Sequence, residues 1–294
     1  MLTLTFLGVG SAFAKRNFHS NALVEAWSHG PDRQSSPDDT LLIDFGGTGP
    51  LALYQLRNAP GFGYLGRHGQ INYSAIRRVF ITHLHADHVG GLEELAYVNR
   101  YQCVDGPPGK AYRPQLIADA VVLECLWENC LKGGLGAQSG HPATLADYFD
   151  VLALRTTDPR GPNRFLLLDQ YEFIPFATHH VQVRHKYDWP SFGLRIHDRV
   201  SGESVLYSSD TRFDYAGLGE MMADAKLIFH EVQLEDQAEP VHALLSELRT
   251  LPEEIRRKMI LYHFSDAWDS PTYSFVAREF AGFAEPHRRY EPFP

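Results

Sequence analysis

The sequence predicts a layered α/β fold with β-sheets inside and helices outside. Short apolar runs rich in β-branched residues recur along the chain, and several of them alternate apolar and polar residues with the two-residue period of a strand. Stretches with helical character lie between these runs. Strands and helices that alternate in this way are typical of sheets covered by helices.

The strands are expected at short runs of Val, Ile, Leu and aromatic residues bounded by turn-forming residues. They are residues 2–7, 22–26, 40–45, 78–82, 115–118, 164–168, 181–184, 192–196, 204–208, 226–231 and 259–262.

The helices are expected between these strands. Leu244 and Leu248 show the i, i+4 apolar spacing of an amphipathic helix. The expected helices are residues 91–101, 120–131, 217–223, 241–248 and 271–280.

Two polar, turn-rich segments interrupt this pattern. Residues 28–39 are expected to form a mobile surface loop, and residues 132–143 a flexible connection or flap. Neither segment has the length or composition of an interdomain linker, and no internal repeat occurs. We therefore expect one domain that spans residues 1–294.

Composition restricts the class of protein. Of the 294 residues, 44% are hydrophobic, which is enough for a large core, and no apolar run reaches the length of a membrane span. The N-terminus lacks the basic start of a signal peptide, and Cys103, Cys125 and Cys130 form no CxxC pair, so we expect a reducing cytoplasm. The net charge of −9 argues against binding of long nucleic acid, which usually requires a basic surface.

Histidines and aspartates gather directly after the strand at 78–82, where residues 80–91 read FITHLHADHVGG. Residues i and i+2 of an extended strand point to the same side, so His83 and His85 can bind one metal ion. The chain then turns into a helix, where Asp87 and His88 can face a second ion. Imidazole and carboxylate groups suit zinc and its neighbours. The alternative interpretation is a run of buried or exposed histidines that bind no metal. The HxHxDH pattern rarely arises by chance, which argues against this alternative.

The segment THLHADHVGG resembles the signature of the metallo-β-lactamase superfamily, and the chain is most similar to the tRNase Z and small-phosphodiesterase branch. The similarity covers nearly the whole chain and includes LTFLGVGSAF near the N-terminus, Asp44 in LLIDFG, His185 before WPSFGLRI, Asp210 in YSSDT and His263 in LYHFS. The resemblance implies an αββα sandwich with two mixed β-sheets flanked by helices.

The resemblance also implies two metal ions per chain. Zinc is expected, and manganese or iron would suit the same ligands. In the implied arrangement Asp44 buttresses the metal-binding loop and Asp210 bridges both ions. The first ion is held by His83, His85 and His185, and the second by Asp87, His88 and His263.

His179 and His180 compete with His185 for the third position of the first metal. We prefer His185 because of its distance to FGLRI, and expect His179, His180 and His141 at the pocket rim or surface. Apolar runs precede His185, Asp210 and His263 (VQVR, SVLYSS and MILY), so these ligands are expected to emerge at strand ends on one edge of the sheets.

His242 is the candidate proton donor. It matches a histidine that tRNase Z-like enzymes use beside the metals, and an imidazole with a pKa of about 6.5 suits proton donation. A solvent-facing histidine at a helix start is the alternative. His230 and Glu231 resemble a family HEA motif, which favours either support of the ligands or a simple strand end. Tyr207 stands where the family has a glutamate that pairs with the proton donor.

The resemblance implies hydrolysis of a phosphodiester by metal-activated hydroxide, with Asp87 and His242 as catalytic residues. Asp210 stands where true β-lactamases have cysteine, which argues against antibiotic hydrolysis. Only 24 residues, 186–209, separate His185 from Asp210, which leaves no room for the tRNA-binding arm of tRNase Z. Relatives that lack this arm include enzymes that cleave cyclic nucleotides, among them the phage anti-Pycsar phosphodiesterases.

We therefore expect a small-molecule phosphodiester substrate, such as a cyclic nucleotide, and no membrane partner. The alternatives are a tRNA 3′-processing endonuclease, a hydrolase of carbon esters, lactones or thioesters at the same metals, and a metal-stabilised binding protein without turnover. Relatives of this kind often form homodimers, so a homodimer is also possible for this chain, in which a neighbouring subunit would complete the pocket.

Overall fold

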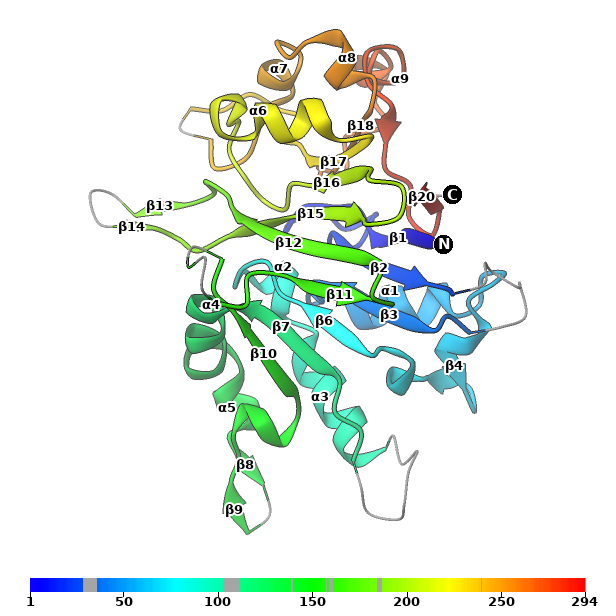
Figure 1. Ribbon diagram of the computed structural model, residues 1–294, viewed down its shortest axis with the longest axis vertical. Coiled ribbons are helices and arrows are strands. Elements are labelled where there is room, and N and C mark those ends of the chain that lie inside the picture. Colours follow the sequence, from blue (N-terminus) through cyan, green and yellow to red (C-terminus); the bar gives the residue numbers. More distant parts are fainter. Residues whose placement is uncertain are drawn as a thin grey trace.

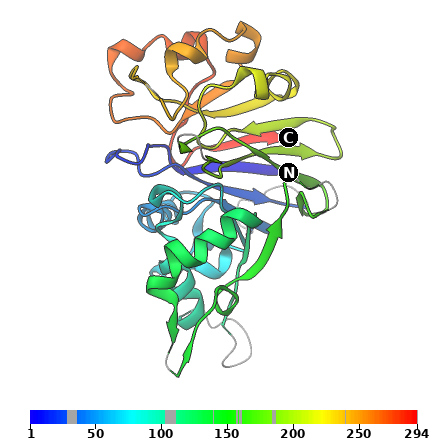
Figure 2. The ribbon, with the colours of Figure 1, turned by 90° about the vertical axis from the view of Figure 1, so that its left-hand side faces the viewer.

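The computed structural model describes residues 1–28, 36–102, 111–138, 140–156, 158, 161–183, 187–238 and 240–293. Two central sheets face each other, and helices cover the outer face of each sheet (Figures 1 and 2). This four-layer arrangement confirms the predicted αββα sandwich.

The first sheet is mixed and has seven strands within the described residues, in the order β10-β7-β6-β3-β2-β1-β20. Strands β3, β6, β7 and β10 run parallel, whereas β1, β2, β3 and β20 pair antiparallel. The bounds are β1 Leu2–Gly8, β2 Asn21–Ala26, β3 Asp39–Ile43, β6 Arg78–Phe80, β7 Gln115–Asp119, β10 Asp150–Leu154 and β20 Arg289–Phe293.

The second sheet is also mixed, with the order β11-β12-β15-β16-β17-β18-β19 in the described part of the chain. Strands β16 to β19 run parallel, and β11, β12, β15 and β16 pair antiparallel. The bounds are β11 Phe165–Leu167, β12 Tyr171–Ala177, β15 Phe192–Asp198, β16 Ser204–Tyr207, β17 Leu227–Glu231, β18 Met259–Tyr262 and β19 Gly282–Phe283.

The helices divide between the two outer layers (Figure 2). Those on the first sheet include α1 Gly49–Leu56, α2 Ala86–Val89, α3 Leu92–Tyr101, α4 Ala120–Cys125, the π-helical turn η3 Leu126–Leu131 and α5 Lys132–Leu135. Those on the second sheet are α6 Tyr215–Asp224, α7 Leu245–Leu248, α8 Glu253–Arg256 and α9 Val276–Glu279. No helix of the described ranges has both the length and the apolar character needed to cross a bilayer.

Short elements complete the described chain. They are the 3₁₀ turns η1 Gly63–Leu65, η2 Tyr73–Ala75, η4 Leu145–Asp147 and η5 Pro271–Tyr273, and the hairpins β4 Gly66–Arg67 with β5 Gln70–Ile71, β8 Ala137–Gln138 with β9 His141–Pro142, and β13 Gln182–Val183 with β14 Tyr187–Asp188.

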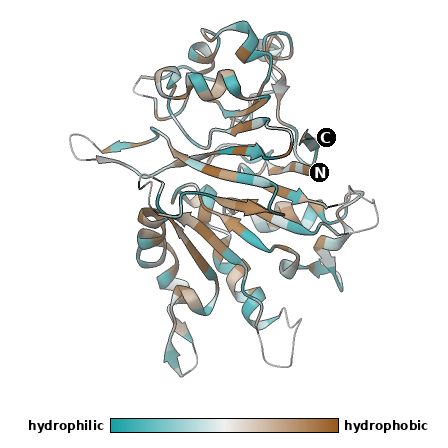
Figure 3. Ribbon diagram, in the orientation of Figure 1, coloured by the Kyte–Doolittle hydropathy of each residue, from teal (hydrophilic) through white to brown (hydrophobic). Residues whose placement is uncertain are grey.

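Aromatic side chains join the two sheets across the core. Phe6 of β1 lies 5.5 Å from Phe229 of β17 and 5.2 Å from Tyr262 of β18, measured between ring centroids. Phe80 of β6 stacks on Phe165 of β11 at 5.9 Å. Figure 3 shows the hydrophobic residues concentrated along the central strands. Burial of each such side chain contributes about 1.5–3 kcal/mol, so this layer holds the sandwich together.

The expected strands are confirmed within the described residues. In the two large sheets β10, β12, β19 and β20 were not predicted, and neither were the short strands β4, β5, β8, β9 and β14. Pro175 explains the omission of β12, because proline cannot donate a ladder hydrogen bond and argues against a central strand. In the structure β11 pairs only with residues 171–173 of β12. At Pro175 the strand is therefore paired on one side only, with Leu194 of β15, and proline is tolerated there.

The helix predictions need two corrections. The helix expected at 241–248 begins only at Leu245, because Gln233 holds the preceding residues in an extended conformation: Gln233 N donates to Ala243 O and Leu245 N donates to Gln233 O. The helix expected at 271–280 divides into η5 and α9. Helices α1 and α8 were not predicted.

The two turn-rich segments have different outcomes. Residues 29–35 of the expected loop at 28–39 lie outside the described residues. The expected flap at 132–143 instead continues the preceding helix as α5 and then forms the β8–β9 hairpin at one end of the molecule (Figure 1).

Candidate metal centre

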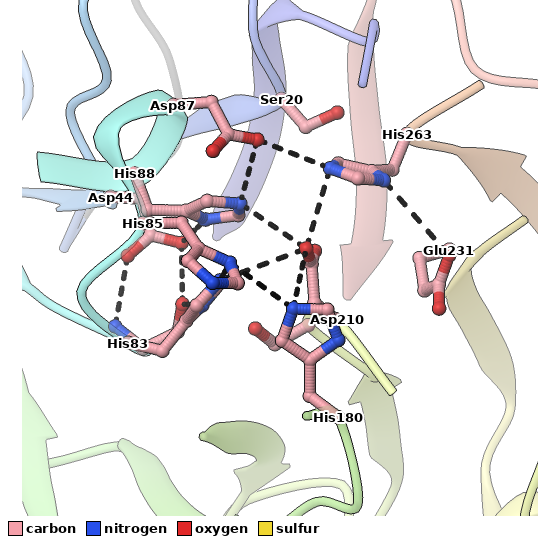
Figure 4. A network of polar contacts seen from close by, with 12 residues as sticks. Ser20, Asp44, His83, His85, Asp87, His88, His180, Asp210, Glu231 and His263 are labelled. Carbon is pink, nitrogen blue, oxygen red and sulfur yellow. Dashed lines mark hydrogen bonds and ion pairs between the residues drawn. The ribbon is translucent and has the colours of Figure 1, made fainter. Parts of the chain in front are cut away.

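The HxHxDH segment leaves β6 in an extended conformation and enters α2 at Ala86, as expected. His83 and His85 point to the same side, and His83 Nε2 lies 3.0 Å from His85 Nδ1. Asp87 and His88 lie in the helical turn and are buried. The change from strand to helix thus aims two pairs of side chains at neighbouring points (Figure 4).

A first cluster of donor atoms is formed by His83, His85, His180 and Asp210, whose atoms all lie within 4.8 Å of one another. His180 Nε2 lies 3.2 Å from His85 Nδ1, and Asp210 Oδ2 lies 3.7 Å from both His83 Nε2 and His180 Nε2. Ligands at zinc–nitrogen distance on a tetrahedron are about 3.3 Å apart, so the spacing fits a small divalent cation.

A second cluster is formed by Asp87, His88, His263 and the same Asp210. Asp87 Oδ2 lies 3.3 Å from His88 Nε2 and 3.4 Å from His263 Nε2. Asp210 Oδ2 lies 3.5 Å from His88 Nε2 and 3.4 Å from His263 Nε2. Because one carboxylate oxygen belongs to both clusters, the geometry fits a pair of cations bridged by Asp210.

Two atoms at the centre lack hydrogen bonds that burial would require. His88 Nε2 and Asp210 Oδ1 are buried and have no hydrogen-bond partner within the described part of the chain. An unpaired buried polar atom is costly, by about 1–3 kcal/mol. A bound cation would supply the missing partner, so the residues present fit a metal.

The protonation states also suit metal binding. Burial opposes ionisation of Asp210, but the neighbouring His263 and His88 hold its pKa well below its usual value. Burial lowers the pKa of His83 well below its usual value and that of His180 to about 4. The first cluster therefore offers a charged carboxylate and neutral imidazoles, which are the forms that coordinate metals. In the second cluster burial opposes the charge of His88, but Asp210, Asp44 and Asp87 raise its pKa well above the usual value.

Residues behind the ligands fix their orientation. Asp44 accepts hydrogen bonds from Thr82 N at 2.8 Å, from Thr82 Oγ1 at 2.7 Å and from His88 Nδ1 at 2.7 Å. His180 Nδ1 donates to Val241 O at 2.8 Å. The two bonds made by histidine Nδ1 leave Nε2 of His88 and of His180 directed toward the cluster, as in protein metal sites generally.

The backbone is strained at the same place. Asp44, Ser209 and His263 have φ angles of 61°, 54° and 63°, a region that non-glycine residues rarely adopt. Such conformations cost about 1–3 kcal/mol each and tend to occur at functional sites. Each follows closely on a strand and turns the chain so that a buried carboxylate or imidazole enters the centre.

His242 lies beside the second cluster and faces a buried carboxylate. Its Nδ1 is 3.4 Å from Glu231 Oε2 and 3.9 Å from Asp210 Oδ2. Burial alone would lower the pKa of His242, but Glu231 and then Asp210 raise it to about 9. Glu231 is fully buried and accepts hydrogen bonds from Thr211 N and Ala243 N, so its position is fixed.

The structure therefore brings together six of the seven metal ligands expected from the sequence, and the seventh, His185, lies outside the described residues. The expectation that His180 lies at the rim or surface is wrong, since it is buried and belongs to the first cluster. His179 and His141 are exposed, as expected. His180 follows β12, and the missed strand concealed the strand-end position that marks the other ligands.

Tyr207, which occupies the family glutamate position, does not contact the proton donor. It is buried between the sheets and stacks on Tyr262 with ring centroids 5.0 Å apart. Glu231, for which the sequence left support and strand end equally open, provides the carboxylate beside His242 instead.

Comparison with known proteins places this centre in a family. A family model described as "Anti-Pycsar protein Apyc1" matches residues 2–290. The anti-Pycsar protein Apyc1 of Paenibacillus sp. (strain J14) is 36% identical over 271 residues, which cover 92% of this chain and 91% of that relative.

Solved structures show the same fold at low identity. The metallo-β-lactamase fold protein YhfI from Bacillus subtilis has a TM-score of 0.66 at 14% identity, and yeast PDE1 has a TM-score of 0.69 at 15% identity. Each match covers 98% of both chains. The predicted metallo-β-lactamase fold is thereby confirmed.

Proposed function

The chain belongs to the anti-Pycsar protein Apyc1 family, and from this premise we propose that it is a metal-dependent phosphodiesterase that cleaves a small nucleotide-type diester, such as a cyclic nucleotide. The observation that carries the proposal is the pair of donor clusters that share Asp210. Two adjacent cations suit in-line displacement at phosphorus, because they stabilise both the attacking and the leaving oxygen.

We assign the ligands of the first ion to His83, His85 and His180, and those of the second to Asp87, His88 and His263, with Asp210 shared. His180 takes the place that sequence comparison assigned to His185, because it lies in the described cluster with the correct spacing. Zinc is the proposed metal, since histidine and aspartate at this spacing are its usual ligands, although manganese and iron accept the same donors. When bound, the ions lower the pKa of a coordinated water and neutralise the charge of the phosphate.

Two residues of the chain then act on the reacting groups: one positions the attacking water, and the other protonates the leaving oxygen. The charged Asp87 carboxylate accepts a hydrogen bond from the attacking water and orients it. His242 carries a proton at neutral pH, because Glu231 and Asp210 favour its charged form. With Nδ1 held toward Glu231, Nε2 of His242 donates a proton to the leaving oxygen.

A small substrate is favoured over tRNA. The described residues between His180 and Asp210 include the β13–β14 and β15–β16 pairs, in which β15 and β16 are joined by a short turn. Neither pair has the length of a tRNA-binding arm. The net charge of −9 also disfavours a long polyanion. We propose the cytoplasm as the location, which agrees with the free thiols of Cys125 and Cys130.

The test is turnover of bis-p-nitrophenyl phosphate and then of cyclic nucleotides by protein of measured metal content. We expect hydrolysis that a chelator abolishes, at about two metal ions per chain. If fully metallated protein cleaved no phosphodiester, the function would have to be sought among thioester or lactone hydrolases.

A further inference from the structure

A cavity of about 540 Å³ opens beside the second cluster. His242 and His263 form its inner wall. The rest consists of the turn at residues 11–14, residues 232–237, Val241 and residues 265–266. Cavities of this size suit small-molecule ligands. A substrate whose phosphate lies at the metal centre therefore has room for a second group on this side.

Phe13 stands on the outer wall of this cavity with 88% of its surface exposed. It occupies a tight turn closed by the hydrogen bond from Ala14 N to Ser11 O, and Ser11 N is bonded to Phe264 O next to His263. Figure 2 shows the loop after β1, in blue, projecting from the layered body. An exposed aromatic ring on a turn bonded to the metal-binding segment is available to a ligand in the cavity.

The loop that carries Phe13 is fixed on its far side as well. Asp266 accepts hydrogen bonds from Lys15 N at 2.7 Å and from Arg16 N at 3.0 Å. The guanidinium of Arg16 donates to Asp269 at 2.7 Å. Because both ends are anchored, little conformational entropy is lost when Phe13 contacts a ligand.

The cavity disfavours a second negative charge. Glu235, Asp236 and Asp266 line it, and its described wall contains no lysine or arginine. A second phosphate would meet these carboxylates, and the cationic group of the wall, His242, already faces the carboxylate of Glu231 at 3.4 Å. The group that enters is therefore uncharged, and an aromatic wall favours a planar one.

We propose that this cavity binds the base of a cyclic mononucleotide and that Phe13 stacks on that base. This inference rests on the proposed phosphodiesterase function. The single phosphate lies at the metal centre, and the base points away from it past His242. Stacking on an aromatic side chain is tolerant of base identity because every base has a π-face.

The test compares a cyclic mononucleotide with an abasic analogue, 1-deoxyribose 3′,5′-cyclic phosphate, on metal-loaded protein. For Phe13→Ala we expect KM for the nucleotide to rise about ten-fold or more, with kcat nearly unchanged and with no change for the abasic analogue. Phe13→Tyr keeps an aromatic ring and should restore KM. Val200→Ala, at an exposed apolar residue on the turn between β15 and β16, is the matched control.

Calorimetry with a phosphorothioate cyclic nucleotide gives a readout independent of turnover, and Phe13→Ala should weaken its Kd by a similar factor. An unchanged KM and Kd, or an equal rise in KM for both substrates, would overturn the stacking assignment. If wild-type protein cleaved neither diester, the proposed function would fail, whereas the calorimetric comparison would still decide whether Phe13 binds the base.

Discussion

Glu231 Oε2 lies 3.4 Å from Nδ1 of His242, and the carboxylate is fully buried. The same oxygen lies 4.0 Å from Nδ1 of His263. One carboxylate at the end of β17 therefore faces both the proposed proton donor and a proposed metal ligand. A substitution at Glu231 should affect His242 and His263 together, whereas a substitution at His242 tests proton transfer by itself.

Replacement of His242 by alanine should remove the proton donor. We expect kcat for a cyclic nucleotide to fall by about 10²–10⁴-fold. The loss should be much smaller for bis-p-nitrophenyl phosphate, since p-nitrophenolate leaves without protonation. Metal analysis should still give the wild-type content, and the exposed His141→Ala is the control. Equal losses on both substrates would contradict the role of His242 as a general acid.

Glu231→Gln should shift the alkaline limb of the pH–rate profile. A general acid acts only when protonated, so activity is present below the pKa of His242 and is lost as pH rises through it. Burial lowers that pKa, and the carboxylate of Glu231 raises it. Glutamine preserves an acceptor for Thr211 N and Ala243 N but removes the charge. The limb should therefore move to lower pH, and an unmoved limb would show that another group sets it.

His180→Ala should release one metal ion. We expect metal content measured by mass spectrometry to fall from about two ions per chain to about one, because the first cluster loses a ligand. The exposed neighbour His179 provides the control variant. His185→Ala is the decisive comparison: if it lost the ion and His180→Ala retained it, the ligand assignment from sequence comparison would stand.

Removal of the metals should destabilise the fold. Without cations the carboxylates of Asp87 and Asp210 remain buried together, and Asp210 Oδ1 has no hydrogen-bond partner among the described residues. Ligand binding to the native state alone contributes about 2.7 kcal/mol per ion at a hundred-fold excess over Kd. We expect a chelator to lower Tm and zinc to restore it. An identical Tm in both conditions would argue against a resident metal.

Phe13→Ala should affect nucleotide binding but not stability. The side chain is 88% exposed, so its loss removes little buried surface. We expect an unchanged Tm together with the raised KM described above. A lower Tm would indicate that the ring packs against protein instead of substrate.

The sequence by itself determined the layered α/β fold and most of the metal centre. Strand periodicity predicts most strands, the family resemblance implies their division into two sheets, and the HxHxDH segment predicts four ligands, because their positions follow from the local geometry of one strand end and one helical turn. Asp210 and His263 were identified by the resemblance of YSSDT and LYHFS to family motifs, and each follows an apolar run that was predicted as a strand.

Only the tertiary structure decided the role of His180, the partner of His242 and the place of Phe13. Pro175 obscured the strand that precedes His180. A proline is tolerated at this position of β12 only because the neighbouring strand β11 ends before it. Glu231 meets His242 because the backbone of Gln233 holds the segment before α7 extended. These contacts join residues that are distant along the chain, so sheet order and loop hydrogen bonds determine them, and no local pattern in the sequence records either.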